Sequence, residues 1–141
     1  TNNVIKKEKL LLKRNHRLTN IRKNYLNQTI SEIVNRKPRF ICIEDLNVSG
    51  IMKNRHLSKA VQAQEFFGFR KQLEYRCSDK GNQLIVVDRF YPSSKLCSCC
   101  GNIKKDLKLS DRVYRCACGN MIDRDFQASI NLKTYGEQFA S

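Results

Sequence analysis

The fold is decided by the stretch 96-LCSCCGNIKKDLKLSDRVYRCACGNMIDRDF-126, which holds five of the seven cysteines and ends on an Asp-Arg-Asp-Phe run. An odd number of closely spaced cysteines is unusual for a disulfide framework, but it is typical of a metal site in a reducing compartment. These cysteines either stabilise a small fold and nothing more, or they also hold an acidic residue in place for chemistry.

Two short cysteine knuckles supply enough thiolates for a closed metal site. A glycine follows each knuckle, which allows a tight turn that brings backbone amides close to the thiolates. Four thiolates satisfy the tetrahedral preference of zinc and leave no open position, as in structural sites. We assign Cys97, Cys100, Cys116 and Cys118 as the zinc ligands. The second knuckle is one residue shorter than the usual C-x2-C spacing, so Cys99 stays open as a substitute ligand.

The charge balance indicates the kind of partner. The chain has 27 Lys and Arg against 13 Asp and Glu, a formal net charge of +14. A polyanion is the simplest counterpart, so DNA or RNA leads, although a solvated basic face without a ligand is the plain alternative. The apolar runs are too short for a membrane span and no cleaved signal is evident, so we expect a cytoplasmic protein without a membrane partner.

A long basic helix is predicted at the start of the chain. Residues 4–36 contain no Gly or Pro, and Leu18, Ile21, Tyr25, Ile30 and Ile33 recur close to helical spacing. The first half of this helix carries a positive stripe that suits a phosphate backbone. Its candidate nucleic-acid contacts are Lys6, Lys7, Lys9, Lys13, Arg14 and Arg17.

The middle of the chain predicts an α/β core. The consecutive apolar residues 40–43 favour a strand buried on both faces, and residues 83–88 favour a second short strand. Between them, a polar loop is followed by a helix over 58–78, whose apolar side is formed by Val61, Phe66, Phe69, Leu73 and Cys77, with Gly81 free to cap it. This order predicts a parallel pair with a right-handed crossover.

The last helix is predicted to follow the cysteine stretch. Phe126 and Ile130 would face inward, and Gly136 would end the helix. The chain then divides into residues 1–95, with the basic helix and most of the core, the ribbon insert at 96–120, and the C-terminal helix of the core at 121–141.

Two acids are candidates for chemistry. Glu44 closes a strand, and ligands of α/β sheets bind at the carboxyl ends of parallel strands. Asp125 opens a helix, where capping is the common role of an acid. In a basic chain, carboxylates that hold Mg²⁺ beside a phosphate track are the parts of metal-assisted phosphodiester hydrolysis.

Four segments, in this order, closely resemble the C-terminal half of TnpB (OrfB) proteins. They are "ICIEDLNVSG", "DRFYPSSKLCSCCG", "RVYRCACG" and "IDRDFQASINL". TnpB proteins are encoded by insertion sequences and are relatives of the type V CRISPR effector nucleases. The resemblance extends over most of residues 1–136.

The resemblance implies a partial RNase H-like, RuvC-type nuclease domain with an inserted zinc ribbon. Full-length members act as RNA-guided DNA endonucleases that use three acids and Mg²⁺. Glu44 matches the second acid and Asp125 the third. The first acid of the family lies on an opening strand before the basic helix, and residues 1–141 show no such strand. We therefore expect an incomplete catalytic site and no cleavage by this chain alone.

The ribbon precedes the helix that presents Asp125, so we expect it both to stabilise the fold and to set where that acid lies. Gln127 departs from the family pattern, which often has Asn there, and its amide contacts are expected to differ. Lys104, Lys105 and Arg112 of the ribbon are further candidate contacts to nucleic acid, although a solvated hairpin also explains them.

Three interpretations remain open at this point. The first is the C-terminal portion of a TnpB-like, transposon-associated nuclease with guide RNA and DNA as partners. The second is a non-catalytic nucleic-acid-binding fragment stabilised by zinc. The third is a zinc-ribbon interaction module without a nucleic-acid role.

Overall fold

The computed structural model describes residues 2–46, 57–108 and 110–140, and its elements follow an α/β order. The elements are α1 (Asn2–Asn35), β1 (Phe40–Glu44), α3 (Leu57–Lys80), β2 (Gln83–Val87), β3 (Val113–Arg115), β4 (Met121–Asp123) and α4 (Arg124–Phe139). The predicted α/β class is confirmed. The polar loop predicted before the second helix lies outside the described residues.

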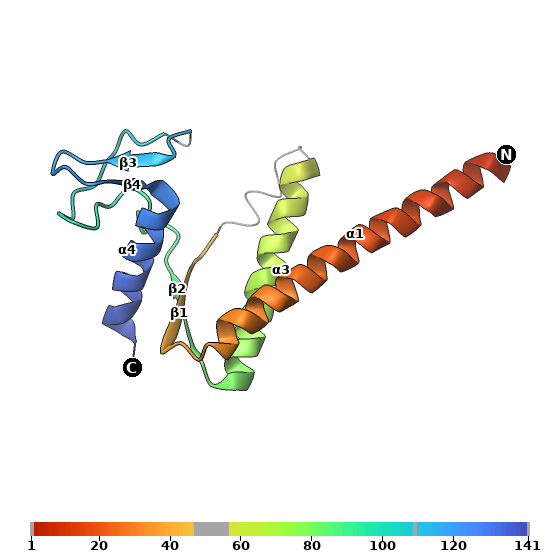
Figure 1. Cartoon of the computed structure of the whole chain (residues 1–141), viewed down its shortest axis with the longest axis horizontal. Helices are drawn as coiled ribbons and strands as arrows, with labels where there is room; N and C mark the ends of the chain where they lie inside the picture. Colours follow the sequence, from red (N-terminus) through yellow and green to blue (C-terminus); the bar gives the residue numbers. More distant parts are fainter. Residues whose placement is uncertain (1, 47–56, 109, 141) are drawn as a thin grey trace.

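The centre of the molecule is a parallel two-stranded sheet. β1 pairs with β2 from Phe40 opposite Gln83 to Glu44 opposite Val87, as predicted. The helices α1 and α3 pack on one side of the sheet and α4 on the other (Figure 1). The β3–β4 hairpin lies at the N-terminal end of α4. The strand β1 is half-buried along its length, so the prediction of a strand buried on both faces is wrong. Within the described residues this sheet has two strands, β1 and β2.

The apolar core lies between the sheet and the helices α1 and α3. It contains Ile30, Val34, Leu73 and Cys77, and Phe69 packs against it. Phe66 lies on the same side of α3 as Leu73, as predicted, but it is 48% exposed because it lines the open cavity instead of the core. The side chain of Val61 lies outside the described part.

The end of α3 confirms its predicted cap. Gly81 adopts a left-handed φ of 72°, and the Asn82 amide donates to the Cys77 carbonyl at 2.9 Å.

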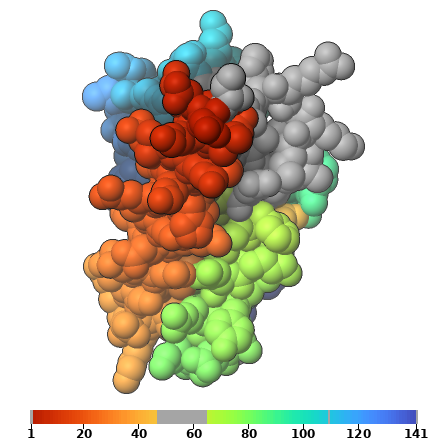
Figure 2. Space-filling model, turned by 90° about the vertical axis from the view of Figure 1, so that its right-hand side faces the viewer, coloured from red at the N-terminus to blue at the C-terminus, as the bar shows by residue number. Residues whose placement is uncertain are grey.

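The N-terminal half of α1 extends away from the sheet (Figure 1). Toward its C-terminal half, α1 lies beside α3 (Figure 2), and Arg22 pairs with Glu65 at 3.4 Å. The predicted long helix is confirmed, but Leu18, Ile21 and Tyr25 are 52–68% exposed, so their helical spacing marks no buried face in this part of α1. Helical spacing indicates amphipathic character, but it does not supply a packing partner. None of the described helices is both long and apolar enough to cross a membrane.

The packing of α4 on β1 corrects two predictions. Gly136 does not end the helix, which continues to Phe139. A Cβ at Gly136 would lie 2.4 Å from a ring carbon of Phe40, so the glycine permits close approach of helix and strand. Phe126 is 60% exposed, because the inward side of α4 is occupied by Gln127, Asn131 and Gly136 instead.

Candidate metal centre and carboxylate site

The four predicted thiol ligands come together at the ribbon. The Sγ atoms of Cys97, Cys100, Cys116 and Cys118 all lie within 4.8 Å of one another. The Sγ–Sγ distances are 3.7 Å for Cys97–Cys118 and 3.6 Å for Cys100–Cys116. Four thiolates at about 2.3 Å from a tetrahedral ion are about 3.8 Å apart, so the group fits a metal ion such as zinc. Cys99 is exposed and is not part of the group.

Two matching turns shape the thiol group. The Cys97 amide donates to the Asn102 carbonyl at 2.8 Å, and the Cys116 amide donates to the Asn120 carbonyl at 2.9 Å. Gly101 and Gly119 adopt φ values of 73° and 92° within these turns. This confirms the predicted need for glycine, because side chains strain such a backbone.

The electrostatics of the group favour a bound cation. Burial opposes ionisation of Cys97, but hydrogen bonds from the amides of Cys100 and Cys99 and from the Asn120 side chain together lower its pKa to about 6. A hydrogen bond from the backbone amide of Asn120 lowers the pKa of Cys118, yet the neighbouring thiols of Cys116 and Cys100 raise this pKa to about 12. A cation removes this conflict, because it allows all four thiols to ionise together.

Tyr114 forms the small core of the ribbon. Its side chain is fully buried, and its hydroxyl donates to the carbonyls of Lys95 at 3.1 Å and Asn102 at 3.4 Å. Burial, followed by the nearby thiolates, raises the pKa of Tyr114 to about 12. The central position of Tyr114 in the strand β3 is the only sequence signal that points to it.

The ribbon docks on α4 through two buried amide side chains. Gln127 Nε2 donates to the Leu96 carbonyl at 2.6 Å, and its Oε1 accepts from Ser98 Oγ at 2.9 Å and from Asn120 Nδ2 at 3.2 Å. Asn131 Nδ2 donates to the carbonyls of Leu96 and Ser93, both at 2.7 Å. The predicted local contacts of Gln127 are therefore contacts to the ribbon.

The two acids at the start of α4 make different contacts. Asp123 is the N-cap, and its Oδ1 accepts from the amides of Asp125 and Phe126, both at 2.9 Å. The Asp125 side chain is 73% exposed and pairs with Arg124 at 3.2 Å. The carboxylate of Asp125 is thus not used as the cap.

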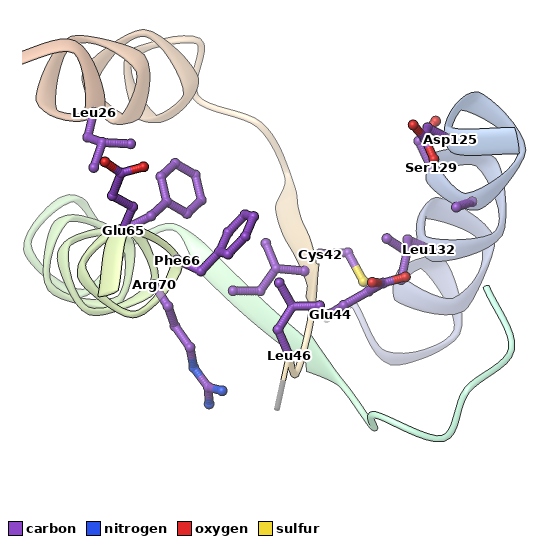
Figure 3. Close-up of a pocket in the computed structure, with 13 residues that line it drawn as sticks. Leu26, Cys42, Glu44, Leu46, Glu65, Phe66, Arg70, Asp125, Ser129 and Leu132 are labelled. Carbon is purple, nitrogen blue, oxygen red and sulfur yellow. The ribbon is translucent and has the colours of Figure 1, made fainter. Parts of the chain in front are cut away.

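Glu44 and Asp125 line the same cavity, of about 640 Å³, from β1 and α4. In Figure 3 the Glu44 side chain extends from β1 toward α4, and Asp125 lies on the first turn of that helix. Glu44 Oε1 accepts a hydrogen bond from Ser93 Oγ. Carboxylate oxygens are the ligands that Mg²⁺ prefers. The structure therefore brings the two predicted acids to one cavity, and their role as metal ligands stays a prediction.

The third acid that lines the cavity, Glu65, is the one paired with Arg22. Arg70 also lines the cavity and is held between Asp45 and Glu74. The hydrogen bond from Arg70 is the main cause that lowers the pKa of Asp45.

The predicted nucleic-acid contacts lie in two groups. Those of α1 are all exposed on its projecting half: Lys6, Lys7, Lys9, Lys13, Arg14 and Arg17. In the ribbon, Lys105 and Arg112 are exposed, whereas Lys104 donates to the Arg115 carbonyl at 3.2 Å and is half-buried. Their contacts to nucleic acid stay a prediction.

Comparison with known proteins agrees with the resemblance seen in the sequence. Residues 66–132 match the family described as Cas12f1-like, TNB domain. The chain is 38% identical over 120 residues to a Streptomyces pristinaespiralis protein named "Putative RNA-guided DNA endonuclease", covering 85% of this chain and 30% of that protein. It is 28% identical over 131 residues to "Putative RNA-guided DNA endonuclease InsQ" of Escherichia coli, covering 82% of this chain and 32% of the relative.

A third relative is named as a CRISPR effector. The chain is 28% identical over 76 residues to "CRISPR-associated endodeoxyribonuclease Cas12f1" of Sulfoacidibacillus thermotolerans, covering 53% of this chain and 18% of that protein. The chain spans about a third or less of the length of these relatives, and the matched region is their C-terminal part.

Proposed function

We propose that this chain, which belongs to the TnpB (OrfB) family through its Cas12f1-like TNB region, acts as the C-terminal portion of an RNA-guided DNA endonuclease. In this proposal the chain forms part of an RNase H-like domain, and the thiol group holds one structural zinc ion. The observation that carries the proposal is that Glu44 and Asp125 reach one cavity from elements far apart in sequence.

In this proposal both carboxylates are metal ligands, but they are held differently. Glu44 is fixed at the end of β1 by its bond to Ser93, whereas Asp125 is exposed on the first turn of α4. Together they would hold Mg²⁺ by carboxylate oxygens. The bound ions supply activation of water and stabilisation of the leaving oxygen of a DNA strand.

The basic residues serve the same function by binding the substrate. The exposed cations of α1 provide a positive track for a phosphate backbone of DNA or guide RNA. Arg70 also lines the cavity, and its guanidinium is paired with Asp45 and Glu74. A cytoplasmic location accords with this function and stays a prediction.

A second candidate function is nucleic-acid binding without cleavage. The observation that favours it is an ion pair: the third carboxylate that lines the cavity, Glu65, pairs with Arg22 and is not free to bind a metal ion. Two carboxylates alone bind Mg²⁺ weakly, since Mg²⁺ requires near-octahedral coordination by oxygen atoms.

The test is Mg²⁺-dependent cleavage of single-stranded DNA by the chain joined to the N-terminal region of a full-length relative, because the chain alone is expected to lack the first acid; zinc content is measured on the same sample. Glu44→Ala and Asp125→Ala are the test variants, and Glu137→Ala removes an exposed α4 carboxylate outside the cavity as the control. Cleavage that is lost in both test variants and kept in the control supports the nuclease. Salt-sensitive DNA binding without any cleavage, from a folded zinc-loaded chain, supports the second candidate.

A further inference from the structure

A hydrogen-bonded chain of residues leads from Glu44 to the ribbon. Ser93 is 5% exposed, and its hydroxyl donates to Glu44 Oε1. The backbone carbonyl of Ser93 accepts from Asn131 Nδ2 at 2.7 Å. One buried residue therefore touches the candidate metal ligand with its side chain and α4 with its backbone.

The same amide groups fix the segment between Ser93 and the first thiol ligand. Asn131 and Gln127 both donate to the carbonyl of Leu96, which directly precedes Cys97. The oxygen of the same Gln127 side-chain amide accepts hydrogen bonds from the Ser98 hydroxyl and the Asn120 side chain. The side chains of Asn131 and Gln127 thus hold the segment 93–98 against α4 and form what we call the amide bridge.

The amide bridge is costly to disturb. Gln127 and Asn131 are 0% and 3% exposed, so water cannot replace a lost partner. A buried amide that loses its hydrogen bond keeps the desolvation penalty without any compensation. The segment therefore has a single satisfied position on α4, and that position sets where the Ser93 hydroxyl points.

We propose that Ser93 is a positioning residue that orients the Glu44 carboxylate toward the metal, and that the ribbon acts on Glu44 through the amide bridge. This inference rests on the proposed function in that Glu44 is taken as a metal ligand. Residues that orient metal ligands by hydrogen bonds change metal affinity by about 10–100-fold when they are removed.

The first experiment measures Glu44 itself. In the zinc-loaded, Mg²⁺-free chain, NMR relaxation of the Glu44 side-chain methylene groups reports its mobility. Ser93→Ala is expected to increase this mobility, and Ser93→Thr, which keeps a hydroxyl, is expected to restore it. Ser129→Ala is the matched control, because Ser129 lines the same cavity but its hydroxyl donates to the Phe126 carbonyl of its own helix.

The second experiment uses Mn²⁺ as the probe for the Mg²⁺ site. Ser93→Ala is expected to weaken Mn²⁺ binding about tenfold, with zinc content unchanged, whereas Ser129→Ala binds Mn²⁺ as the wild type does. If Ser93→Ala does not fold, Ser93→Cys serves as the second variant, because a thiol has similar shape but is a weak donor.

The outcomes separate this inference from the proposed function. Unchanged Glu44 mobility in Ser93→Ala overturns the positioning role, whatever the Mn²⁺ result. Wild-type Mn²⁺ binding by Ser93→Ala, alongside lost binding by Glu44→Ala, overturns it too and leaves the proposed function standing. Wild-type Mn²⁺ binding by Glu44→Ala defeats the proposed function, while increased Glu44 mobility in Ser93→Ala still supports the contact.

Discussion

The two faces of the parallel sheet are packed by different chemistry. Toward α1 and α3 the contact is apolar, with Ile30, Val34, Leu73 and Cys77 at its centre. Toward α4 the contact includes the close approach at Gly136 and, where the ribbon docks, buried amides. Apolar burial stabilises without direction, whereas hydrogen bonds fix relative position. The comparison teaches that one face supplies stability and the other supplies the geometry of the candidate site.

The largest effect is expected from removing one ligand of the four-cysteine group in the ribbon, which docks on α4. Cys100→Ser or Cys116→Ser should release zinc, unfold the ribbon and loosen α4, because structural zinc binding is coupled to folding. Zinc content and thermal unfolding measure this, and Cys99→Ser, outside the thiol group, is the control. Retention of one zinc equivalent with unchanged thermal stability would refute the ligand assignment.

The next effect tests the apolar side. Leu73→Ala should lower the free energy of unfolding by about 2–5 kcal/mol, because it leaves a cavity at a fully buried position. Chemical denaturation measures the change, and Leu12→Ala, at an exposed position of α1, should change it little. Equal effects at the two positions would contradict the placement of the core.

A smaller effect is expected where α4 meets β1. Gly136→Ala should cost about 1–3 kcal/mol, because its Cβ would overlap the Phe40 ring. Gly68→Ala in α3 is the matched control: among the described residues, no atom beyond its own turn of the helix would lie within 4 Å of the added Cβ, so it should stabilise by about 0.5–1 kcal/mol. Denaturation curves give the free energy of unfolding of both variants. A stabilising Gly136→Ala would show that α4 lies farther from β1.

The smallest effect is a pH dependence near the cavity. The hydrogen bonds of Arg70 are the main cause that lowers the pKa of both Asp45 and Glu74 in the folded chain. Their stabilisation is therefore present above the ordinary carboxyl pKa, about 4, and is lost as the pH falls below it. Asp45→Asn should reduce the loss of thermal stability between pH 6 and 3 slightly, because the group is partly solvated. A variant with the wild-type pH slope would speak against this ion pair.

Much of the fold could be predicted from the sequence because it depends on local patterns. Helical spacing, consecutive apolar residues and the two cysteine knuckles indicated α1, the strands β1 and β2, and the thiol group, and the structure confirms these; the strands β3 and β4 were not predicted. The same patterns misplaced Phe126 and Gly136, because periodicity alone cannot tell which side of α4 the ribbon covers. From the sequence alone, polar residues such as Gln127 and Asn131 would be placed on the surface, whereas both are buried.

The candidate site was predicted only in part for a related reason. Glu44 and Asp125 were found by their places at the ends of a strand and a helix. Ser93 was missed, because its hydroxyl partner lies 49 positions away in the chain and no periodic signal connects them. Contacts between a side chain and a distant carboxylate follow from the packing of whole elements, which spacing does not specify.

The assignment of the cap of α4 to Asp123 rather than Asp125 has an evolutionary consequence. A single substitution at Asp125 would remove a candidate metal ligand and leave the bonds of Asp123 to the helix N-terminus in place. Under the proposed function, a descendant of the full-length protein could therefore lose cleavage in one mutational step and keep its folded shape. Under that proposal, the Asp-Arg-Asp run offers a short route from a nuclease to a nucleic-acid-binding protein.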